Sequence, residues 1–333
     1  MSLMKSKQRR LRLDGINRKA AGKAAVAVLS LAFFSLTAAY AQAPAGPNRP
    51  PEVPEGYVIT PFGYFHPSCV LQLAEGETLL SDGRIIQHAD GTLETLAVCS
   101  YPHYTARGEM VIAGGAGGQP PTISHSWIES ADVTTSSSYG ELSANWTVPP
   151  KPSANHGQTL YFFPGLEDTN DVVSILQPVL GWNSDFGSAW GIASWNCCPS
   201  GITVESSPVS VSSGDKIQGT IKSTCSAGTL SCSKWNVTTK DVTTGKSTKL
   251  SNTPSEGQTF NWAFAGAVEV YNVVKCGDYP SNGALSFSSL GLYNDKFVKI
   301  SSPSWSIDLW ASGLTPQCSY GGTAAAAKVT LDY

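Results

Sequence analysis

Short stretches of alternating apolar and polar residues, separated by turns, recur from Thr122 to the C-terminus and limit the fold more than any other feature. No window there shows sustained 3.6-residue periodicity with helix caps. Many short strands in about 210 residues are typical of a β-sandwich, and that length can bury a sizeable core. We therefore predict an all-β domain over residues 122–333, with strands near residues 142–148, 201–205, 209–211, 216–221, 235–242, 267–274 and 284–287.

The N-terminus has the layout of a secretory signal. Eight basic residues lie between Lys5 and Lys23, an uncharged stretch runs from Ala24 to Ala39, and Ala39-Tyr40-Ala41 fits a cleavage site. The apolar stretch is short for a membrane span, which needs ~20 residues. An uncleaved anchor is the alternative. We predict a signal peptide over residues 1–41, a secreted or periplasmic protein and no membrane association after cleavage.

Eight cysteines in an exported chain favour disulfides over a thiol enzyme or a zinc site. There is no C-x-x-C spacing of the kind that holds zinc. The predicted bonds are Cys69–Cys99, Cys225–Cys232 and Cys276–Cys318. Adjacent Cys197 and Cys198 can bond to each other or to other partners, and the sequence leaves this open.

Two joints divide the chain before the main domain. Residues 42–55 are Pro-rich and cannot form a core. Residues 56–110 contain short apolar stretches and turns, which indicate hairpins clipped by Cys69–Cys99. Residues 114–121 are a Gly-rich joint that ends in two prolines, a composition that proteases cut readily. We place the domain boundary there and predict that residues 42–121 hold a small N-terminal segment, of which 42–118 is a removable pro-segment.

The main domain carries little charge. From Gln119 to Tyr333 it has 11 Lys, no Arg and 16 Asp and Glu. It therefore lacks the basic surface that nucleic-acid binding needs. Few carboxylates also means few native ion pairs to lose in acid, which is compatible with an acidic environment.

The common catalytic layouts are absent. There is no H-E-x-x-H, G-x-S-x-G or phosphate-binding loop. No histidine follows His156, which disfavours a serine triad. Glu167, Asp168 and Asp171 could hold calcium, but a solvated loop is the simpler interpretation. We expect neither a metal nor a cofactor.

Two apolar stretches each contain one conspicuous polar side chain. Gln177 lies within residues 172–182, and Glu269 lies within residues 262–271. Either could simply point outward on an alternating strand.

Several short motifs follow one another along the chain: Trp146-Thr147-Val148-Pro149, Gly165-Leu166-Glu167, Ile175-Leu176-Gln177, Trp190 with Trp195, Gly214-Asp215 and Ala267-Val268-Glu269-Val270. Their order resembles the glutamic peptidase family, the eqolisins. Those enzymes are acid-acting endopeptidases with a concanavalin A-like, lectin-like β-sandwich and a catalytic Gln–Glu pair. By this resemblance Gln177 matches the catalytic Gln, Glu269 the catalytic Glu and Glu167 the acidic residue of a turn.

The chain also departs from the family pattern. The turn reads Gly165-Leu166-Glu167-Asp168 instead of G-I-D-G, and Val268 and Val270 flank Glu269 where the family has Ala and Trp. Ser194 stands where a Glu precedes the second tryptophan. The resemblance covers residues 125–300 and implies a divergent member.

The resemblance implies peptide hydrolysis, with a polypeptide as the substrate, and we expect a monomer. Glu269 would take a proton from water, and the Gln177 amide would stabilise the oxyanion. Glu167 is a candidate substrate-binding residue. Trp182, Trp190, Trp195 and Tyr271 could line the substrate cleft, although core packing is the simpler interpretation of these aromatic residues. One alternative is a non-catalytic carbohydrate-binding or adhesion module. Another is a glycoside hydrolase that pairs Glu269 with Glu205 or Glu167.

Overall fold

The structure is a computed structural model that describes residues 49–80, 83–111, 126–170, 174–198, 201–310 and 316–333. The chain divides into Met1–Ala39 and Tyr40–Tyr333, and only the second unit contains described residues. The predicted signal peptide and the whole Gly-rich joint, residues 114–121, lie outside the described residues. No helix in the described part is long and apolar enough to cross a membrane.

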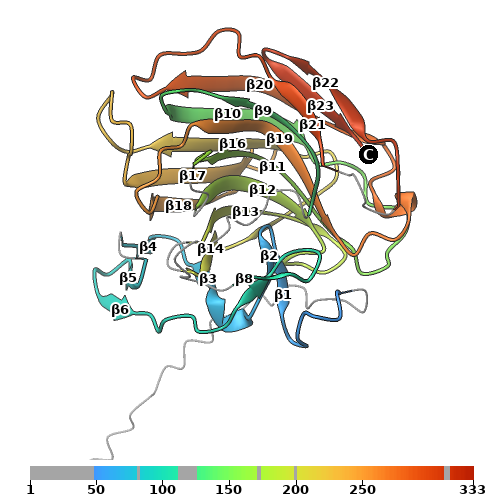
Figure 1. Cartoon of the computed structure of the whole chain (residues 1–333), viewed down its shortest axis with the longest axis horizontal. Coiled ribbons are helices and arrows are strands. Elements are labelled where there is room, and N and C mark those ends of the chain that lie inside the picture. The colour runs from blue at the N-terminus through green and yellow to red at the C-terminus, as the bar shows by residue number, and fades with distance from the viewer. Residues whose placement is uncertain (1–48, 81–82, 112–125, 171–173, 199–200, 311–315) are drawn as a thin grey trace, which may run out of the picture. The chain divides into compact units, whose positions relative to one another are not determined.

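Two large sheets form the body of the molecule (Figure 1). The seven-stranded sheet has the order β18-β17-β16-β10-β20-β23-β22. Its strands are β10 Tyr139–Thr147, β16 Lys216–Ser223, β17 Lys234–Asp241, β18 Ser247–Pro254, β20 Ala284–Asn294, β22 Gly321–Ala325 and β23 Lys328–Asp332.

The nine-stranded sheet has the order β21-β9-β19-β11-β12-β13-β14-β3, and β15 also pairs with β13. All pairs are antiparallel except β14 with β3. The strands are β3 Val70–Leu73, β9 Trp127–Thr134, β11 Thr159–Glu167, β12 Ile175–Trp182, β13 Trp190–Cys197, β14 Thr203–Ser206, β15 Val209–Val211, β19 Trp262–Tyr271 and β21 Ser306–Leu309.

Two small sheets belong to the N-terminal segment, which is residues 49–111. The four-stranded sheet has the order β1-β2-β7-β8, and the three-stranded sheet β4-β5-β6. Their strands are β1 Val58–Thr60, β2 Gly63–Phe65, β4 Thr78–Leu79, β5 Ile85–Gln87, β6 Leu93–Thr95, β7 His103–Tyr104 and β8 Met110–Val111. The described part of the chain also contains the 3-10 helices η1 Pro67–Cys69 and η4 Cys276–Asp278.

The two large sheets pack face to face, and glycines mark where they approach most closely. A Cβ at Gly219 on β16 would lie 2.6 Å from the Pro178 side chain on β12, and one at Gly266 on β19 would lie 2.2 Å from Phe287 on β20. Because successive strand residues point to opposite faces, Pro178 and Gly266 show which residues of β12 and β19 face the core. The fold is an all-β sandwich, as predicted.

The N-terminal segment adds a strand to the main sandwich. Strand β3 pairs in parallel with β14, from Val70 opposite Thr203 to Leu73 opposite Ser206. Gln72 Nε2 donates to Glu205 Oε1 at 3.0 Å, and the Ser207 backbone N–H donates to Leu73 O at 3.0 Å. The sequence predicts separate hairpins here and does not anticipate that one strand joins the nine-stranded sheet.

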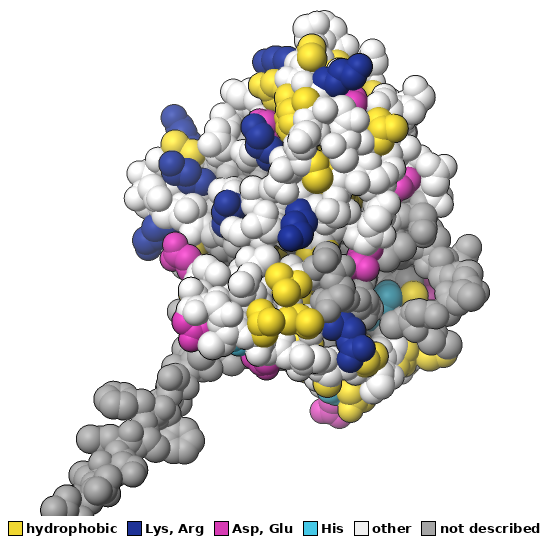
Figure 2. Space-filling model, turned by 90° about the vertical axis from the view of Figure 1, so that its left-hand side faces the viewer, with side chains coloured by type: hydrophobic (Ala, Val, Ile, Leu, Met, Phe, Trp, Pro, Cys, Tyr) yellow, Lys and Arg dark blue, Asp and Glu magenta, His cyan; other side chains and the backbone are white. Residues whose placement is uncertain are grey.

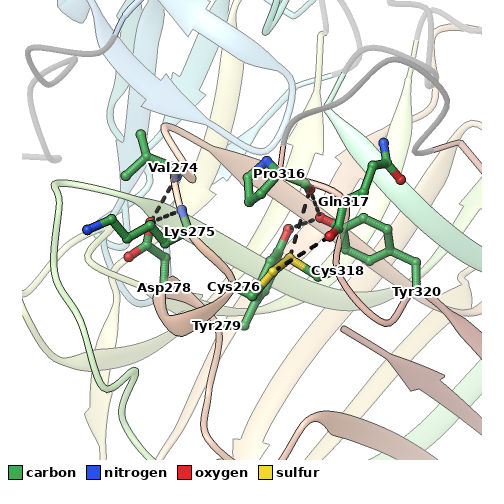
Figure 3. Close-up of a disulfide and its surroundings, with 9 residues drawn as sticks. All are labelled: Val274, Lys275, Cys276, Asp278, Tyr279, Pro316, Gln317, Cys318 and Tyr320. Atoms are coloured by element: carbon green, nitrogen blue, oxygen red, sulfur yellow. Dashed lines mark hydrogen bonds between the residues drawn. A yellow bond between two sulfur atoms is a disulfide. The ribbon is translucent and has the colours of Figure 1, made fainter.

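Four disulfides are present, and the three predicted pairings are confirmed. Cys197 and Cys198 bond to each other, which the sequence left open. Figure 3 shows Cys276–Cys318, where Asp278 Oδ2 accepts the backbone N–H groups of Val274 and Lys275. This bond ties η4 to the region before β22.

Figure 2 shows one face of the molecule, on which Lys and Arg side chains are scattered singly or in small groups with acidic side chains between several of them.

Candidate active site

Gln177 lies on the outer face of the nine-stranded sheet, which we define as the face turned away from the seven-stranded sheet. Its neighbour Pro178 points into the core, so Gln177 points out of it. Its side chain passes over Gly165 of β11, where an added Cβ would lie 3.7 Å from Gln177 Cγ. Gln177 is nevertheless 0% exposed.

The side-chain amide of Gln177 is buried without hydrogen bonds to other parts of the described chain. Among the described residues, neither Nε2 nor Oε1 has a hydrogen-bond partner. Leaving a buried polar group unsatisfied costs about 1–3 kcal/mol, and such groups are few in native proteins. Gln177 is therefore placed at a cost to stability.

Glu269 lies on the same outer face, since Gly266 and Val268 of β19 alternate with it and face the core. Its Oε1 accepts 2.6 Å hydrogen bonds from Ser126 Oγ and Tyr271 Oη. Its Oε2 has no partner among the described residues. Burial raises the pKa of Glu269 to about 8, although hydrogen bonds from Ser126, Tyr271 and Trp127 act in the opposite direction. In this arrangement the carboxyl is neutral below that pH.

The two residues flank β11 but are not level with each other. Leu176, next to Gln177, pairs with Leu166, whereas Glu269 pairs with Tyr161. The offset along β11 is about four residues, or roughly 13 Å at 3.3 Å per residue. Gln177 leans over β11, while Oε1 of Glu269 is held by Ser126, which lies next to β9 on the far side of β19. The structure brings both side chains to one face without a hydrogen bond between them.

Glu167 lies on the same face at the end of β11 and is 2% exposed. Burial raises its pKa well above the usual range, and the negative charges of Glu269 and Asp132 raise it further. The carboxyls of this face therefore influence one another across β11 and β19. Asp132 belongs to the same group, and burial raises its pKa to about 6.

Tyr161 is a site residue that the sequence did not single out, because it lies inside the apolar run Leu160–Phe163. It pairs with Glu269, so both side chains point from the outer face. Burial raises the pKa of Tyr161 well above its usual value, and the charges of Asp185, Glu269 and Glu205 add to this. Ser126 was also missed, and no local pattern marks it.

The four aromatic residues predicted for the cleft divide between the two faces. Trp195 pairs directly with Gln177, and Tyr271 donates to Glu269, so both belong to the outer face. Trp182 and Trp190 pair with each other, and their rings lie 5.2 Å apart. They point into the sandwich, where Trp190 also packs on Phe162. Trp182 is an odd number of residues from Gln177 on β12, and Trp190 is an odd number of residues from Trp195 on β13, which places each pair on opposite faces of its strand.

A hairpin from the N-terminal segment lies over this face. We call β1, β2 and the turn between them, residues 58–65, the N-terminal hairpin (Figure 1). Tyr161 Oη donates to Ile59 O at 3.2 Å. The Phe62 ring meets Trp195 edge-on at 6.3 Å, and the Tyr64 ring meets Tyr271 at 5.5 Å. The hairpin thus contacts the cross-strand partner of Gln177 and the hydrogen-bond donor of Glu269.

A metal site and a sugar-binding surface find little support in the described part of the chain. In the described part of the chain, no group of three His, Cys, Asp or Glu residues is placed to hold a metal ion. Asp168 Oδ2 accepts the Thr259 N–H and Oδ1 accepts the Asn170 N–H, and Asp171 lies outside the described residues. For sugar stacking, Trp195 and Tyr271 are both buried, and Tyr101 is the aromatic side chain among the exposed large apolar residues of the described part.

No model of a protein family matches the chain, and no curated protein matches it. Among solved structures, scytalido-glutamic peptidase with a peptide-based transition-state analogue is similar at a TM-score of 0.47 and 16% identity, covering 62% of this chain and 98% of that one. SCP-B, a member of the eqolisin family in complex with the tripeptide Ala-Ile-His, is similar at a TM-score of 0.43 and 18% identity, with the same coverage. Aspergilloglutamic peptidase from Aspergillus niger is similar at a TM-score of 0.35 and 15% identity, covering 53% of this chain and 98% of that one. Because these similarities are low, the function of this chain has to be argued from its own residues.

Proposed function

We propose that the protein is a secreted, monomeric endopeptidase that works in acid and hydrolyses peptide bonds with Gln177 and Glu269. The observation that carries the proposal is the pair of buried polar groups on one face, each with an oxygen or nitrogen that has no partner among the described residues. Uncompensated burial of this kind is retained where the group has a task beyond stability. A water molecule and a peptide carbonyl supply the missing partners.

The chemistry follows from the two functional groups. Ionised Glu269 takes a proton from the attacking water and returns it to the leaving amine. The Gln177 amide N–H donates to the oxyanion of the tetrahedral intermediate, and one such donor contributes about 2.7–4 kcal/mol. Because an amide does not titrate, Glu269 sets the lower pH limit of activity. Burial raises the pKa of both Glu167 and Asp132, so these neighbouring carboxyls take up protons more readily than ordinary carboxyls as the pH falls.

In this proposal the N-terminal segment is an inhibitory pro-segment. Its hairpin contacts Trp195 and Tyr271, and its strand β3 pairs with β14, so a substrate cannot reach the face while the segment stays. Ser126, which holds Glu269 Oε1, comes shortly after the Gly-rich joint. Cutting the joint separates the segment from Ser126, whose carbonyl accepts the Val270 N–H. The mechanism further requires that the offset of roughly 13 Å along β11 between Glu269 and Gln177 closes to the span of one water and one peptide carbonyl once the segment has left.

Opening of the face also changes the protonation of Glu269. Under the hairpin its pKa is about 8 because of burial, so the carboxyl is neutral in acid and cannot accept a proton. Entry of water removes the cause of the shift and lowers the pKa toward the ordinary value of about 4.3. The opened enzyme therefore has an ionised base at moderately acidic pH.

A test uses the full chain with a recognition sequence for a site-specific protease inserted between Gly117 and Gly118. The uncut chain should leave an unstructured protein substrate intact, and the cut chain should digest it in acid. Digestion that begins only after cutting supports both the activity and the pro-segment. If the uncut chain is equally active, the pro-segment is refuted; if neither form is active over pH 3 to 7, the peptidase proposal fails.

A further inference from the structure

We propose that Trp195 is the floor of a subsite for an aromatic side chain of the substrate, and that Phe62 of the N-terminal hairpin occupies it in this structure. This inference rests on the proposed peptidase function and names the class of peptide that the site prefers.

The position of Trp195 places this subsite beside Gln177. The two residues are direct partners in the β12–β13 ladder, so their side chains stand side by side on the outer face. Trp195 is 1% exposed, and Phe62 is 8% exposed where it packs against it at 67° between ring planes. Edge-to-face packing is a preferred geometry of aromatic pairs. When the hairpin leaves, a space of the size of an aromatic ring opens next to the proposed oxyanion donor.

The hairpin is held through its main chain as well as through its side chains. Tyr161 Oη donates to the carbonyl of Ile59, three residues before Phe62, from the strand between β12 and β19. A bond to a carbonyl oxygen is available to a peptide of any sequence, whereas the Trp195 contact depends on the side chain. The face thus offers one contact that positions a peptide and another that selects among peptides.

A second aromatic contact lies at the Glu269 side. The Tyr64 ring meets Tyr271 at 84°, and Tyr64 Oη donates to Asn272 Oδ1 at 3.3 Å. Phe62 lies in the turn of the hairpin, and Tyr64 lies on β2. The hairpin therefore places one aromatic ring, Phe62, beside the cross-strand partner of Gln177 and another, Tyr64, beside the hydrogen-bond donor of Glu269.

The hairpin itself is a tight turn and not an extended chain. Thr60 Oγ1 donates to Gly63 O at 3.1 Å and accepts the Phe62 N–H at 3.3 Å. Gly63 has φ 118°, and an added Cβ there would lie 2.2 Å from Tyr104 O on β7. Because this turn is closed, the peptide bonds on either side of Phe62 are not in the extended conformation of a bound substrate. The hairpin can therefore fill the subsite as an inhibitor. A substrate would bring its aromatic side chain there in an extended strand.

The test uses the full chain cut at the inserted site between Gly117 and Gly118, with both fragments retained. Peptides that differ at a single position are digested in acid, and kcat/KM is compared for Phe, Tyr, Leu and Ala at that position. We expect the aromatic peptides to be cleaved about tenfold faster than the Ala peptide, a ratio within the range that apolar pockets achieve. Trp195→Leu should abolish the preference. Trp262→Leu should retain it, because Trp262 lies on the same face opposite Glu167 and donates to Asp132.

A binding measurement decides the question independently of catalysis. The synthetic octapeptide VITPFGYF, which has the sequence of residues 58–65, is titrated into the cut chain that carries Glu269→Gln. Replacing the peptide's first Phe, the counterpart of Phe62, by Ala should weaken binding about tenfold, and Phe62→Ala in the chain should strengthen binding of the unaltered peptide. Equal binding of the two peptides, or equal cleavage at all four residues by an enzyme that still needs Glu269, would overturn the subsite and leave the peptidase proposal intact. If no peptide is cleaved, the peptidase proposal fails and the titration alone decides whether Trp195 binds aromatic side chains.

Discussion

Tyr271 donates a 2.6 Å hydrogen bond to Glu269 Oε1, and its ring packs on Tyr64 of the N-terminal hairpin at 5.5 Å. One side chain thus connects the proposed base to the segment that lies over it. The same contact implies that departure of the hairpin changes the surroundings of Tyr271 and, through it, those of Glu269.

Tyr271→Phe should move the acidic limb of the pH profile upward in the cut enzyme. The Tyr271 hydrogen bond lowers the pKa of Glu269, so its loss raises the pKa at which the base becomes ionised. We expect a shift of about one pH unit in kcat/KM, since a hydrogen bond to a charged group is worth about 1.5–3 kcal/mol. Tyr293→Phe, on the seven-stranded sheet, serves as the control and should leave the profile unchanged. A profile identical to wild type would show that Tyr271 does not act on the titrating group.

Gln177→Leu should abolish activity while leaving stability unchanged or higher. The substitution removes two buried polar atoms that have no partner in the described part of the chain and keeps much of the volume. Gln158→Leu is the matched comparison, because Gln158 Nε2 donates to Ala154 O and Asp278 O. It should lower the free energy of unfolding by about 1–3 kcal/mol. Urea denaturation of both variants measures the difference. An equal loss of unfolding free energy in the two variants would mean that the Gln177 amide has hydrogen-bond partners in solution.

Stability should rise as the pH falls from 8 toward 4.5. Burial raises the pKa of both Glu129 and Glu269 to about 8. Between the unfolded pKa near 4.3 and that value, the folded state holds protons that the unfolded state has released, so stability is present at low pH and lost on approaching pH 8. Each group contributes a slope of up to about 1.4 kcal/mol per pH unit.

Glu129→Gln tests the source of this slope without touching the proposed site. Glu129 is 0% exposed and its Oε2 accepts the Gly321 N–H, so a neutral amide of the same shape can replace it. Denaturant unfolding at several pH values should show a shallower dependence in the variant than in wild type. Parallel curves would mean that Glu129 has an ordinary pKa in the folded protein.

Several strands, such as β10, β16 and β17, and three disulfides could be predicted because their signals are local. Strands β11, β12 and β13 were not predicted, because they are buried along their whole length and show no alternation. Alternation over eight or nine residues marks a strand, and the order of the cysteines along the chain suggests nearest partners. The pairing of β3 with β14 could not be predicted, since it joins residues more than 130 positions apart and depends on packing. Tyr161 was hidden in an apolar run, and its role appears only from the register with Glu269. The core position of Trp182, by contrast, could have been predicted from its odd spacing from Gln177.

Cys69→Ser with Cys99→Ser should loosen the N-terminal segment selectively. The disulfide closes a loop of 30 residues, and its loss should cost about 3–4 kcal/mol if the chain-entropy account holds. Because the segment lies over the outer face, backbone amides of the hairpin should exchange hydrogen faster while those of β16 and β17 stay protected. Hydrogen exchange followed by mass spectrometry measures both. Equal acceleration throughout the sandwich would show that the segment and the sandwich unfold as one unit.

The central claim is that Glu269 and Gln177 together hydrolyse peptide bonds. The most direct measurement is acid-pH digestion of an unstructured protein by the cut wild-type chain and by its Glu269→Gln and Gln177→Ala variants, with Glu141→Gln, which breaks the Lys222–Glu141 ion pair of the other sheet, as the control. We predict full activity in wild type and control, no measurable activity in Glu269→Gln, and a loss of about 10²–10³-fold in Gln177→Ala. Digestion by Glu269→Gln at the wild-type rate would contradict the account.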